Sequence, residues 1–195
     1  MAKKNQLTKS DHLEYDEYNR LLDCLHKDKQ FIWELYATLS FCTACRASDI
    51  LNLKWEDIVG KHRLTITEKK TRKPRMIILN PSVQEKLRQL RRLLGDPYLD
   101  GYIFFNKSTG MPLTIQYVNR VLKTFKKKYN LDIENFSTHT FRKTFGRYVY
   151  DSQNHSAESL LLLNKILNHS NIDVTKAYIG ITQDEINGIY NSIKL

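Results

Sequence analysis

Apolar side chains recur at helical spacing along nearly the whole of this 195-residue chain. After Tyr18, for example, Leu21, Leu22 and Leu25 follow at steps that put all four side chains on one face of a helix. The predicted helical stretches are residues 18–25, 31–39, 48–53, 83–94, 114–125, 141–149, 160–167 and 174–179, with a last helix over 185–195. We therefore expect the core to form mainly between amphipathic helices.

Two short runs rich in β-branched and other strand-forming residues interrupt the helical pattern. Leu64–Thr67 and Met76–Leu79 flank the charged stretch Glu68–Arg75. Two such runs close together in sequence favour an antiparallel pair of strands. The predicted fold class is mostly α (α+β): a helical domain with a small antiparallel β-sheet or hairpin whose tip is basic.

Capping residues mark several helix boundaries. Asn80 followed by Pro81 is a favourable cap and first-turn pair, and Thr114 opens a later helix. The run Thr182–Glu185 has the pattern of a capping box in front of the last helix.

The composition suits one compact domain over residues 1–195. The hydrophobic content is 41%, and no internal repeat, low-complexity stretch or Gly/Ser linker divides the chain. Residues 1–12 are polar and rich in lysine, so we expect a flexible tail there.

The charge balance favours an anionic partner. Lys and Arg number 31 against 21 Asp and Glu, which gives a formal net charge of +10. No apolar run approaches the roughly 18 residues of a membrane span, and no signal peptide opens the chain. We therefore expect a cytoplasmic protein with no membrane partner.

The three cysteines are too few for a disulfide framework and fit a reducing compartment. Cys42 and Cys45 form a C-x-x-C pair, but zinc would need a second pair of ligands, and a redox pair would need a different turn. We interpret these side chains, together with Cys24, as small buried thiols.

Three segments far apart in sequence contain the residues with the clearest chemical character. Thr43–Ile58 reads T-A-C-R-A-S-D-I-L-N-L-K-W-E-D-I, and His139–Arg142 reads H-T-F-R. In the third segment, Leu167–Ser170 reads L-N-H-S and Thr175–Tyr178 reads T-K-A-Y.

In this order these segments resemble the signature boxes of the tyrosine recombinase (phage integrase) family, T-G-x-R-x-S-E-L-x-x-L-x-W-x-D-I, H-x-x-R, L-G-H-S and T-x-x-Y. H-x-x-R alone arises often by chance, and it is the joint occurrence of the boxes in this order around a hairpin that is specific. Ala44 and Asn168 stand where the family usually has glycine, and Asp49 where it usually has glutamate. Asn tolerates left-handed backbone geometry better than most residues, so we expect Asn168 to adopt it.

The residue types also suit attack on a phosphodiester, in which negative charge gathers on the non-bridging oxygens. A guanidinium stays charged and binds two oxygens at once, so Arg46 and Arg142 are the predicted pair that counters this charge. A tyrosine hydroxyl must lose its proton to become a nucleophile. Tyr178 is the predicted nucleophile, and His139 the predicted proton acceptor.

The resemblance assigns further roles around this pair. A lysine in the hairpin gives a proton to the leaving 5′-oxygen, and Lys70 matches best, with Lys69 as the alternative and a plain solvated basic hairpin as the reading without function. His169 adds a hydrogen bond to the phosphate, and Asp49 supports the helix and arginine of the first box.

The implied reaction uses no cofactor and no metal, because a phosphotyrosine bond stores the cleaved phosphodiester until the strands rejoin. The sequence contains no G-x-x-x-x-G-K-[ST] loop and no acidic cluster of the two-metal type.

The resemblance implies a site-specific DNA recombinase that acts by inversion or by integration and excision. Its partners would be double-stranded DNA with a specific recombination site and further copies of the chain, in a tetramer on DNA that exchanges the helix over 185–195. Only forty-five residues precede Arg46, so we expect no separate N-terminal DNA-clamping domain, and the size is similar to that of fimbrial phase-variation invertases. A nucleoid-associated protein of a bacterium or mobile element is expected.

Two other classes of function stay open. A type IB topoisomerase shares the chemistry but relaxes supercoiled DNA without pairing two sites. A catalytically silent DNA-binding accessory factor would keep the basic surface, although competent residues at every predicted site position argue against it.

Overall fold

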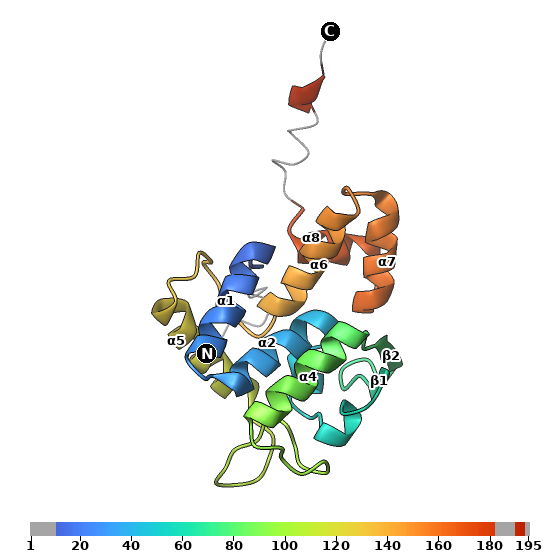
Figure 1. The fold of residues 1–195 in the computed structure, drawn as a ribbon. Coiled ribbons are helices and arrows are strands. Elements are labelled where there is room, and N and C mark those ends of the chain that lie inside the picture. The colour runs from blue at the N-terminus through green and yellow to red at the C-terminus, as the bar shows by residue number, and fades with distance from the viewer. Residues whose placement is uncertain (1–10, 182–189, 194–195) are drawn as a thin grey trace, which may run out of the picture.

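In the computed structural model, which describes residues 11–181 and 190–193, most of the described chain is helical (Figure 1). The main elements are α1 (Tyr15–Lys27), α2 (Phe31–Thr43), α3 (Ala47–Ile50), β1 (Arg63–Thr67), β2 (Pro74–Ile78), α4 (Pro81–Leu93), α5 (Ile115–Lys128), α6 (Thr140–Ser152), α7 (Ala157–Leu167) and α8 (Ile172–Ile179). The short 3₁₀ turn Trp55–Asp57 follows α3. The predicted fold class, mostly helical with one small antiparallel sheet, is confirmed.

Helix α2 forms the centre of the fold. Its residues Leu35, Tyr36, Ala37 and Leu39 have no exposed surface, and the helix contacts α1, α3, α4 and α6. Because its neighbours cover it on several sides, α2 is apolar around most of its circumference and not along a single stripe. Figure 1 shows α2 between the group α6, α7 and α8 above it and α4 and the hairpin on the other side.

Strands β1 and β2 form the predicted antiparallel hairpin, with Thr65 opposite Met76. Leu64 points into the core and is fully buried, whereas Met76 and Ile78 are 61% and 62% exposed. The second strand begins at Pro74, two residues before the predicted start at Met76, because the pairing extends to Thr67 opposite Pro74. The charged tip thus contains fewer residues than the sequence indicated.

Side-chain caps explain why two helices begin earlier than their apolar pattern predicts. The Ser156 side chain accepts a hydrogen bond from the Ser159 amide in front of α7, and the Asn171 side chain accepts one from Val174 in front of α8. The predicted caps at Asn80 and Thr114 are confirmed, since each side chain accepts a bond from a first-turn amide.

A second, smaller core joins α6, α7 and α8. It contains Tyr150, Leu160, Leu163 and Ile179. Gly146 on α6 allows this close packing, because a Cβ atom there would lie 2.8 Å from the Ile179 side chain. This contact sets how near α8 comes to α6.

The first described residues of the chain differ from the predicted flexible tail over residues 1–12. Asp11 and His12 were expected in the flexible tail, but Asp11 exchanges backbone and side-chain hydrogen bonds with Asn135. Most of the predicted last helix over 185–195, together with its capping box Thr182–Glu185, lies outside the described residues.

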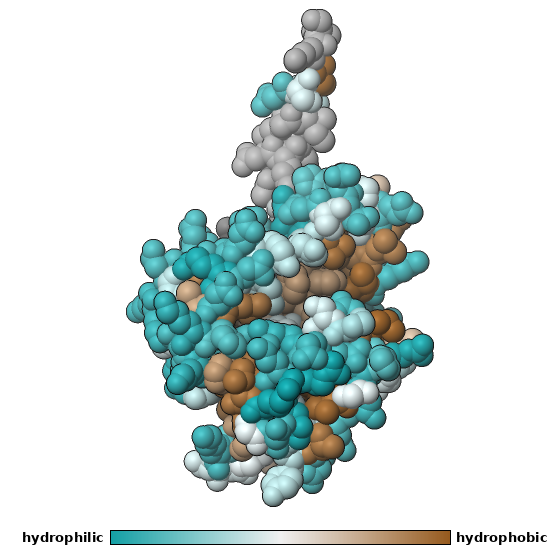
Figure 2. All heavy atoms as spheres, viewed as in Figure 1, coloured by the Kyte–Doolittle hydropathy of each residue, from teal (hydrophilic) through white to brown (hydrophobic). Residues whose placement is uncertain are grey.

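The surface in Figure 2 is mostly hydrophilic, with apolar patches that include one over α7. Leu161 and Leu162 of that helix are 58% and 51% exposed. Among the described residues, no helix is both long and apolar enough to cross a membrane.

Candidate active site

Arg46 lies at the start of α3, directly after the backbone turns out of α2. The turn is made by Ala44, whose φ of 48° is in the left-handed region. The Arg46 side chain is 15% exposed and donates a hydrogen bond of 2.6 Å from Nη1 to Glu68. The first signature segment therefore presents its arginine beside the hairpin.

Arg142 reaches the same place from α6. It is 2% exposed, and it donates hydrogen bonds to the carbonyl oxygens of Ala44 and Leu167. Arg75 of β2 donates to the Ala44 carbonyl as well, and to that of Thr43. These bonds bring the end of α2, the hairpin, α6 and the end of α7 together around one cluster of guanidinium groups.

Glu68 is the carboxylate at the centre of this cluster and is fully buried. It accepts hydrogen bonds from Arg46 at 2.6 Å, from Thr71 at 2.7 Å and from Asn168 at 2.8 Å, and Arg75 lies 3.5 Å away. Burial alone would raise the pKa of Glu68, but these donors outweigh burial and lower the pKa to about 2. Glu68 therefore stays ionised under all ordinary conditions.

Asn168 has φ 52° and ψ 48°, which confirms the predicted left-handed geometry. This backbone position ends α7 and directs the side-chain amide toward Glu68 and Thr71. The next residue, His169, is thereby held close to the hairpin.

Lys70 lies at the exposed tip of the hairpin, next to Lys69. The Asp49 carboxylate accepts a hydrogen bond of 3.0 Å from the Lys69 backbone amide. Asp49 thus ties α3, the helix that follows Arg46, to the hairpin. The positive charge of Lys70 contributes to lowering the pKa of both His139 and His169.

Both histidines are held in the neutral form. Atoms packed around the His139 ring remove part of its hydration, and this effect, with the charges of Arg142 and Lys143, lowers its pKa. Burial and the charge of Arg142 lower the pKa of His169 to about 4. The Nδ1 atom of His169 lies 3.0 Å from the Thr175 hydroxyl, which fixes the ring orientation.

Tyr178 on α8 packs among the basic residues of the site. Its ring meets that of His169 edge to face, with the centroids 4.9 Å apart. The Arg142 guanidinium lies 5.8 Å from the ring centroid and the Lys143 ammonium 5.2 Å. Burial raises the pKa of Tyr178, and the positive charge of Arg142 offsets part of this rise.

The Tyr178 hydroxyl is buried, and no group in the described part of the chain meets both the distance and the angle of a hydrogen bond to it, although Arg142 lies close enough to lower its pKa. A buried hydroxyl without a partner is costly in most proteins, and such an atom at a functional site is often completed by a ligand.

The contacts described above bring the predicted site residues Arg46, Arg142, His169 and Tyr178 together, with Lys70 and His139 at the exposed side of the cluster.

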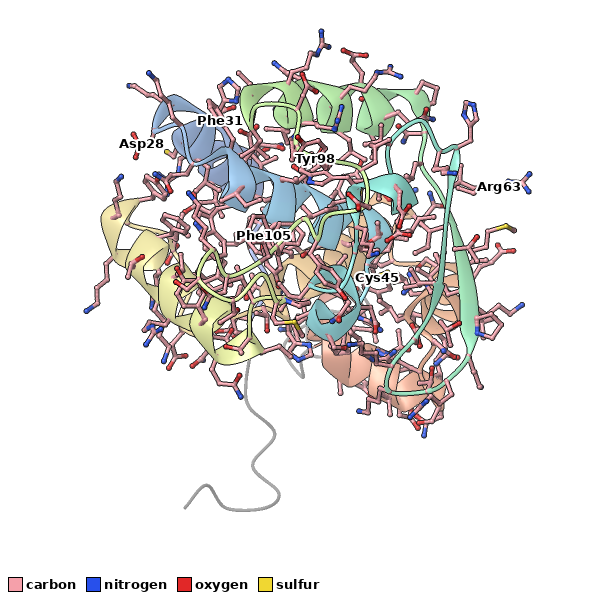
Figure 3. The ribbon with its side chains drawn as sticks, turned by 90° about the horizontal axis from the view of Figure 1, so that it is seen from below. Asp28, Phe31, Cys45, Arg63, Tyr98 and Phe105 are labelled. Atoms are coloured by element: carbon pink, nitrogen blue, oxygen red, sulfur yellow. The ribbon has the colours of Figure 1, made fainter. Side chains whose placement is uncertain are left out.

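Sequence reasoning missed Glu68, Arg75 and Lys143 as site residues. Glu68 and Arg75 were counted as part of a charged tip, and only their pairing with the first signature segment reveals their place. Lys143 had one available signal, its position directly after Arg142. In Figure 3, Cys45, which precedes Arg46, lies inside the molecule, whereas Arg63 at the start of β1 projects away from it.

The cysteines take no part in this arrangement as ligands or crosslinks. All three are free, Cys45 is buried, and Cys24 and Cys42 are half-buried, so the expectation of buried thiols is confirmed fully only for Cys45. Burial raises the pKa of Cys42 to about 12. No cluster of metal-binding side chains occurs within residues 11–181 and 190–193.

A large cleft of about 1070 Å³ opens elsewhere, between the start of α2 and the start of α5. Its lining includes Trp33, Phe105, Met111 and Tyr117, and none of the predicted site residues. The predicted site is rich in cationic groups, which suits a polyanion.

A helical domain in which Arg142, Lys143 and His169 lie beside a tyrosine, next to a second arginine held by the hairpin, has the features of a protein that acts on phosphodiesters. Comparison with known proteins agrees. The model of the phage integrase family matches residues 11–185. The chain belongs to the phage integrase (tyrosine recombinase) family.

Individual relatives support the same assignment. The chain is 34% identical over 148 residues to the probable integrase/recombinase YoeC of Bacillus subtilis, covering 76% of this chain and 77% of YoeC. Among solved structures, the post-cleavage complex of the XerH site-specific recombinase with palindromic difH substrate has a TM-score of 0.70 at 20% identity, over 96% of this chain and 55% of XerH. A lambda integrase (75–356) dimer bound to a COC′ core site has a TM-score of 0.65 at 22% identity, over 92% of this chain and 62% of that one.

The aligned region covers only part of each of these relatives. The chain spans about three quarters of YoeC but only 55% and 62% of the two solved chains. At such identities the two structures establish the fold that the chains share, and the activity of the whole protein is a separate question.

Proposed function

We propose that this protein is a site-specific recombinase that cleaves and rejoins DNA through a covalent 3′-phosphotyrosine bond at Tyr178. The observation that carries the proposal is the environment of Tyr178, whose ring lies beside Arg142, Lys143 and His169. Cationic groups around a nucleophile stabilise the charge that develops on an attacked phosphate.

In the cleavage step the Tyr178 oxygen attacks the phosphorus, a new O–P bond forms, and the bond from phosphorus to the 5′-oxygen breaks. His139 takes the tyrosine proton, and the Lys70 ammonium gives a proton to the leaving 5′-oxygen. Arg46 and Arg142 hold the non-bridging oxygens, and His169 adds a hydrogen bond. Attack by a 5′-hydroxyl of another strand reverses every step, so neither a cofactor nor a metal is needed.

The direction of each pKa shift suits these roles. The lowered pKa of His139 keeps the ring neutral and able to accept a proton at neutral pH. The raised pKa of Tyr178 keeps the hydroxyl protonated until substrate binds. Asp49 accepts a hydrogen bond from the Lys69 backbone amide and so holds the hairpin. The charge of Lys70 lowers the pKa of both His139 and His169, which supports Lys70 over Lys69 as the proton donor.

The partners in this proposal are double-stranded DNA with a specific recombination site and further copies of the chain. The related XerH and lambda integrase structures hold DNA, and the lambda integrase is a dimer. The net charge of +10 suits a DNA partner. We propose a tetramer on DNA that exchanges the segment 185–195, a role for which the exposed Tyr190 and Ile193 are suited, and a location on the bacterial nucleoid.

Covalent trapping tests the proposal. The target sequence is first selected from random duplexes with Tyr178→Phe protein, which should bind without cleaving. Incubation of the wild-type protein with a nicked duplex of that sequence should then give a protein–DNA adduct that survives SDS, and Tyr178→Phe should give none. An adduct that persists in this variant and maps to Tyr148 or Tyr150 would show that the nucleophile is assigned wrongly.

The same protein and selected duplex also distinguish a recombinase from a type IB topoisomerase and from a catalytically silent accessory factor. Relaxation of supercoiled plasmid that lacks the selected sequence would indicate a topoisomerase. Binding without any adduct in the wild-type protein would indicate an accessory factor.

A further inference from the structure

Glu68 is a buried charge that the cleavage mechanism above does not use. It has no exposed surface, although burying a carboxylate is costly unless several donors compensate it. The compensation is concentrated on one oxygen, because Arg46, Thr71 and Asn168 all donate to Oε2. The other oxygen, Oε1, accepts no hydrogen bond within the described chain and faces Arg75 at 3.5 Å. A chain that needed only a stable hairpin could place an apolar residue here.

These four partners come from four separate segments. Arg46 precedes α3, Thr71 lies in the hairpin turn, Arg75 lies on β2, and Asn168 ends α7 just before His169. Glu68 is therefore the point at which the segments that carry Arg46, Lys70 and His169 are joined by side chains. A shift of this carboxylate would change the relative positions of all three segments.

The contact with Arg46 is the shortest of the four, at 2.6 Å, and it uses only Nη1. A guanidinium is planar and has five N–H donors in a fixed arrangement. Anchoring one nitrogen therefore sets the direction of the others and reduces the conformational freedom that would otherwise be lost when a phosphate binds. The charge of Glu68 does not cancel the basic character of the site, since Arg75 and Arg142 also lie there.

We propose that Glu68 is a positioning residue for strand cleavage: it orients the Arg46 guanidinium toward the attacked phosphate. This inference rests on the proposed recombinase function. It assigns Glu68 no contact with DNA, so loss of its carboxylate should affect the rate of cleavage more than the affinity for a half-site.

The test measures single-turnover adduct formation and half-site binding for Glu68→Gln. Cleavage should slow about 10- to 100-fold, less than for loss of a charge-stabilising donor itself. The half-site Kd should stay within about threefold, because the phosphate contacts that dominate affinity remain. Glu85→Gln is the matched control, since it removes an exposed carboxylate that pairs with Arg88 on α4 and should leave both values unchanged.

A double-mutant cycle separates positioning from general stabilisation. If Glu68 acts through Arg46, Glu68→Gln in the Arg46→Ala background should slow cleavage by no more than about twofold further. An equal loss in both backgrounds, or a wild-type rate for Glu68→Gln, would overturn the proposal.

Glu68→Asp covers the possibility that Glu68→Gln does not fold, because it keeps the charge but withdraws the carboxylate from Arg46. It should melt near the wild-type temperature and still cleave slowly, and a wild-type rate for a folded Glu68→Asp would also overturn the proposal. Adduct formation by the wild-type protein on the same duplex distinguishes the two proposals. If the wild-type protein forms no adduct, the recombinase function itself is overturned. If the wild-type protein and the Glu68 variants form the adduct at the same rate, only the role of Glu68 is overturned.

Discussion

Ala44 occupies a backbone conformation that usually favours glycine, with φ 48°. A Cβ atom in the left-handed region costs roughly 1–2 kcal/mol. The cost is outweighed because the Ala44 carbonyl accepts hydrogen bonds from both Arg75 and Arg142, and hydrogen bonds to charged groups each contribute about 1.5–3 kcal/mol. A single carbonyl oxygen thus helps to hold two arginines of the site.

Arg142 is held by two backbone carbonyl oxygens, whereas Arg46 is held by the Glu68 carboxylate. The two side chains can therefore be removed one at a time to compare their effects. We expect Arg46→Ala and Arg142→Ala to slow cleavage by about 100- to 1000-fold while both variants still bind DNA, because these groups act on charge that develops in the transition state. Arg142→Ala should also lower the melting temperature, since it leaves the buried carbonyls of Ala44 and Leu167 without their donor.

Gel shifts, single-turnover cleavage and thermal melts measure these effects. Arg63→Ala is the control, because that arginine projects from the outside of the hairpin (Figure 3) and should not affect cleavage. Equal losses in binding and rate would make Arg46 and Arg142 ordinary phosphate contacts, whose removal mainly reduces the salt dependence of affinity.

At the scale of elements, the position of α8 decides where Tyr178 lies. Helix α8 contacts α6 and α7, and its buried Ile179 packs against the bare face of α6 at Gly146. Tyr178, the proposed nucleophile, is therefore positioned by its neighbour in sequence, Ile179, through a contact that any larger residue at 146 would disturb.

The substitution Gly146→Ala has two opposing effects on the stability of the protein. Alanine favours a helix interior by about 0.5–1 kcal/mol relative to glycine, but its Cβ would lie 2.8 Å from Ile179 Cγ2. Ile179 is fully buried, so we expect α8 to shift and cleavage to fall, with little gain or a net loss in stability.

Single-turnover adduct formation and a thermal melt measure the outcome. Ile179→Leu moves the branch away from the β-carbon, so the double variant should recover part of the rate. A Gly146→Ala protein that is more stable and fully active would show that α8 tolerates the added methyl group.

At the scale of the whole molecule, the described end of the chain bears apolar side chains that the domain leaves exposed. Tyr190 and Ile193 are 70% and 63% exposed. The sequence adds Ile186 and Ile189 to the same helical stripe, although both lie outside the described residues. A helix of about a dozen residues is marginal alone and gains stability by burying such a stripe.

We expect deletion of Glu185–Leu195 to leave a folded protein that binds a single half-site but loses cooperative pairing and most strand transfer. The physical reason is that the exposed side chains of Tyr190 and Ile193 are available to a second copy. Gel shifts with one and two half-sites, together with a strand-transfer assay, measure the effect. Unfolding of the truncated monomer in a thermal melt would show instead that the segment belongs to its own core.

Much of this molecule could be predicted from local patterns. The periodicity after Tyr18, the β-rich runs around the hairpin tip, and the caps at Asn80 and Thr114 depend on neighbours within a few residues. The left-handed geometry at Asn168 could be predicted for the same reason. The early starts of α7 and α8 were missed because polar caps extend a helix beyond its apolar stripe.

The sequence by itself determined the helical class, the hairpin and the family, because these depend on residue types at fixed spacings along the chain. The tertiary structure alone decided that Glu68 bonds to Arg46 and Asn168, that Arg75 and Arg142 share the Ala44 carbonyl, and that Lys143 lies over the Tyr178 ring. Most of these contacts join residues that are tens of positions apart. Their energy comes from buried charges and hydrogen bonds that exist only once the helices have packed, and no local pattern encodes it.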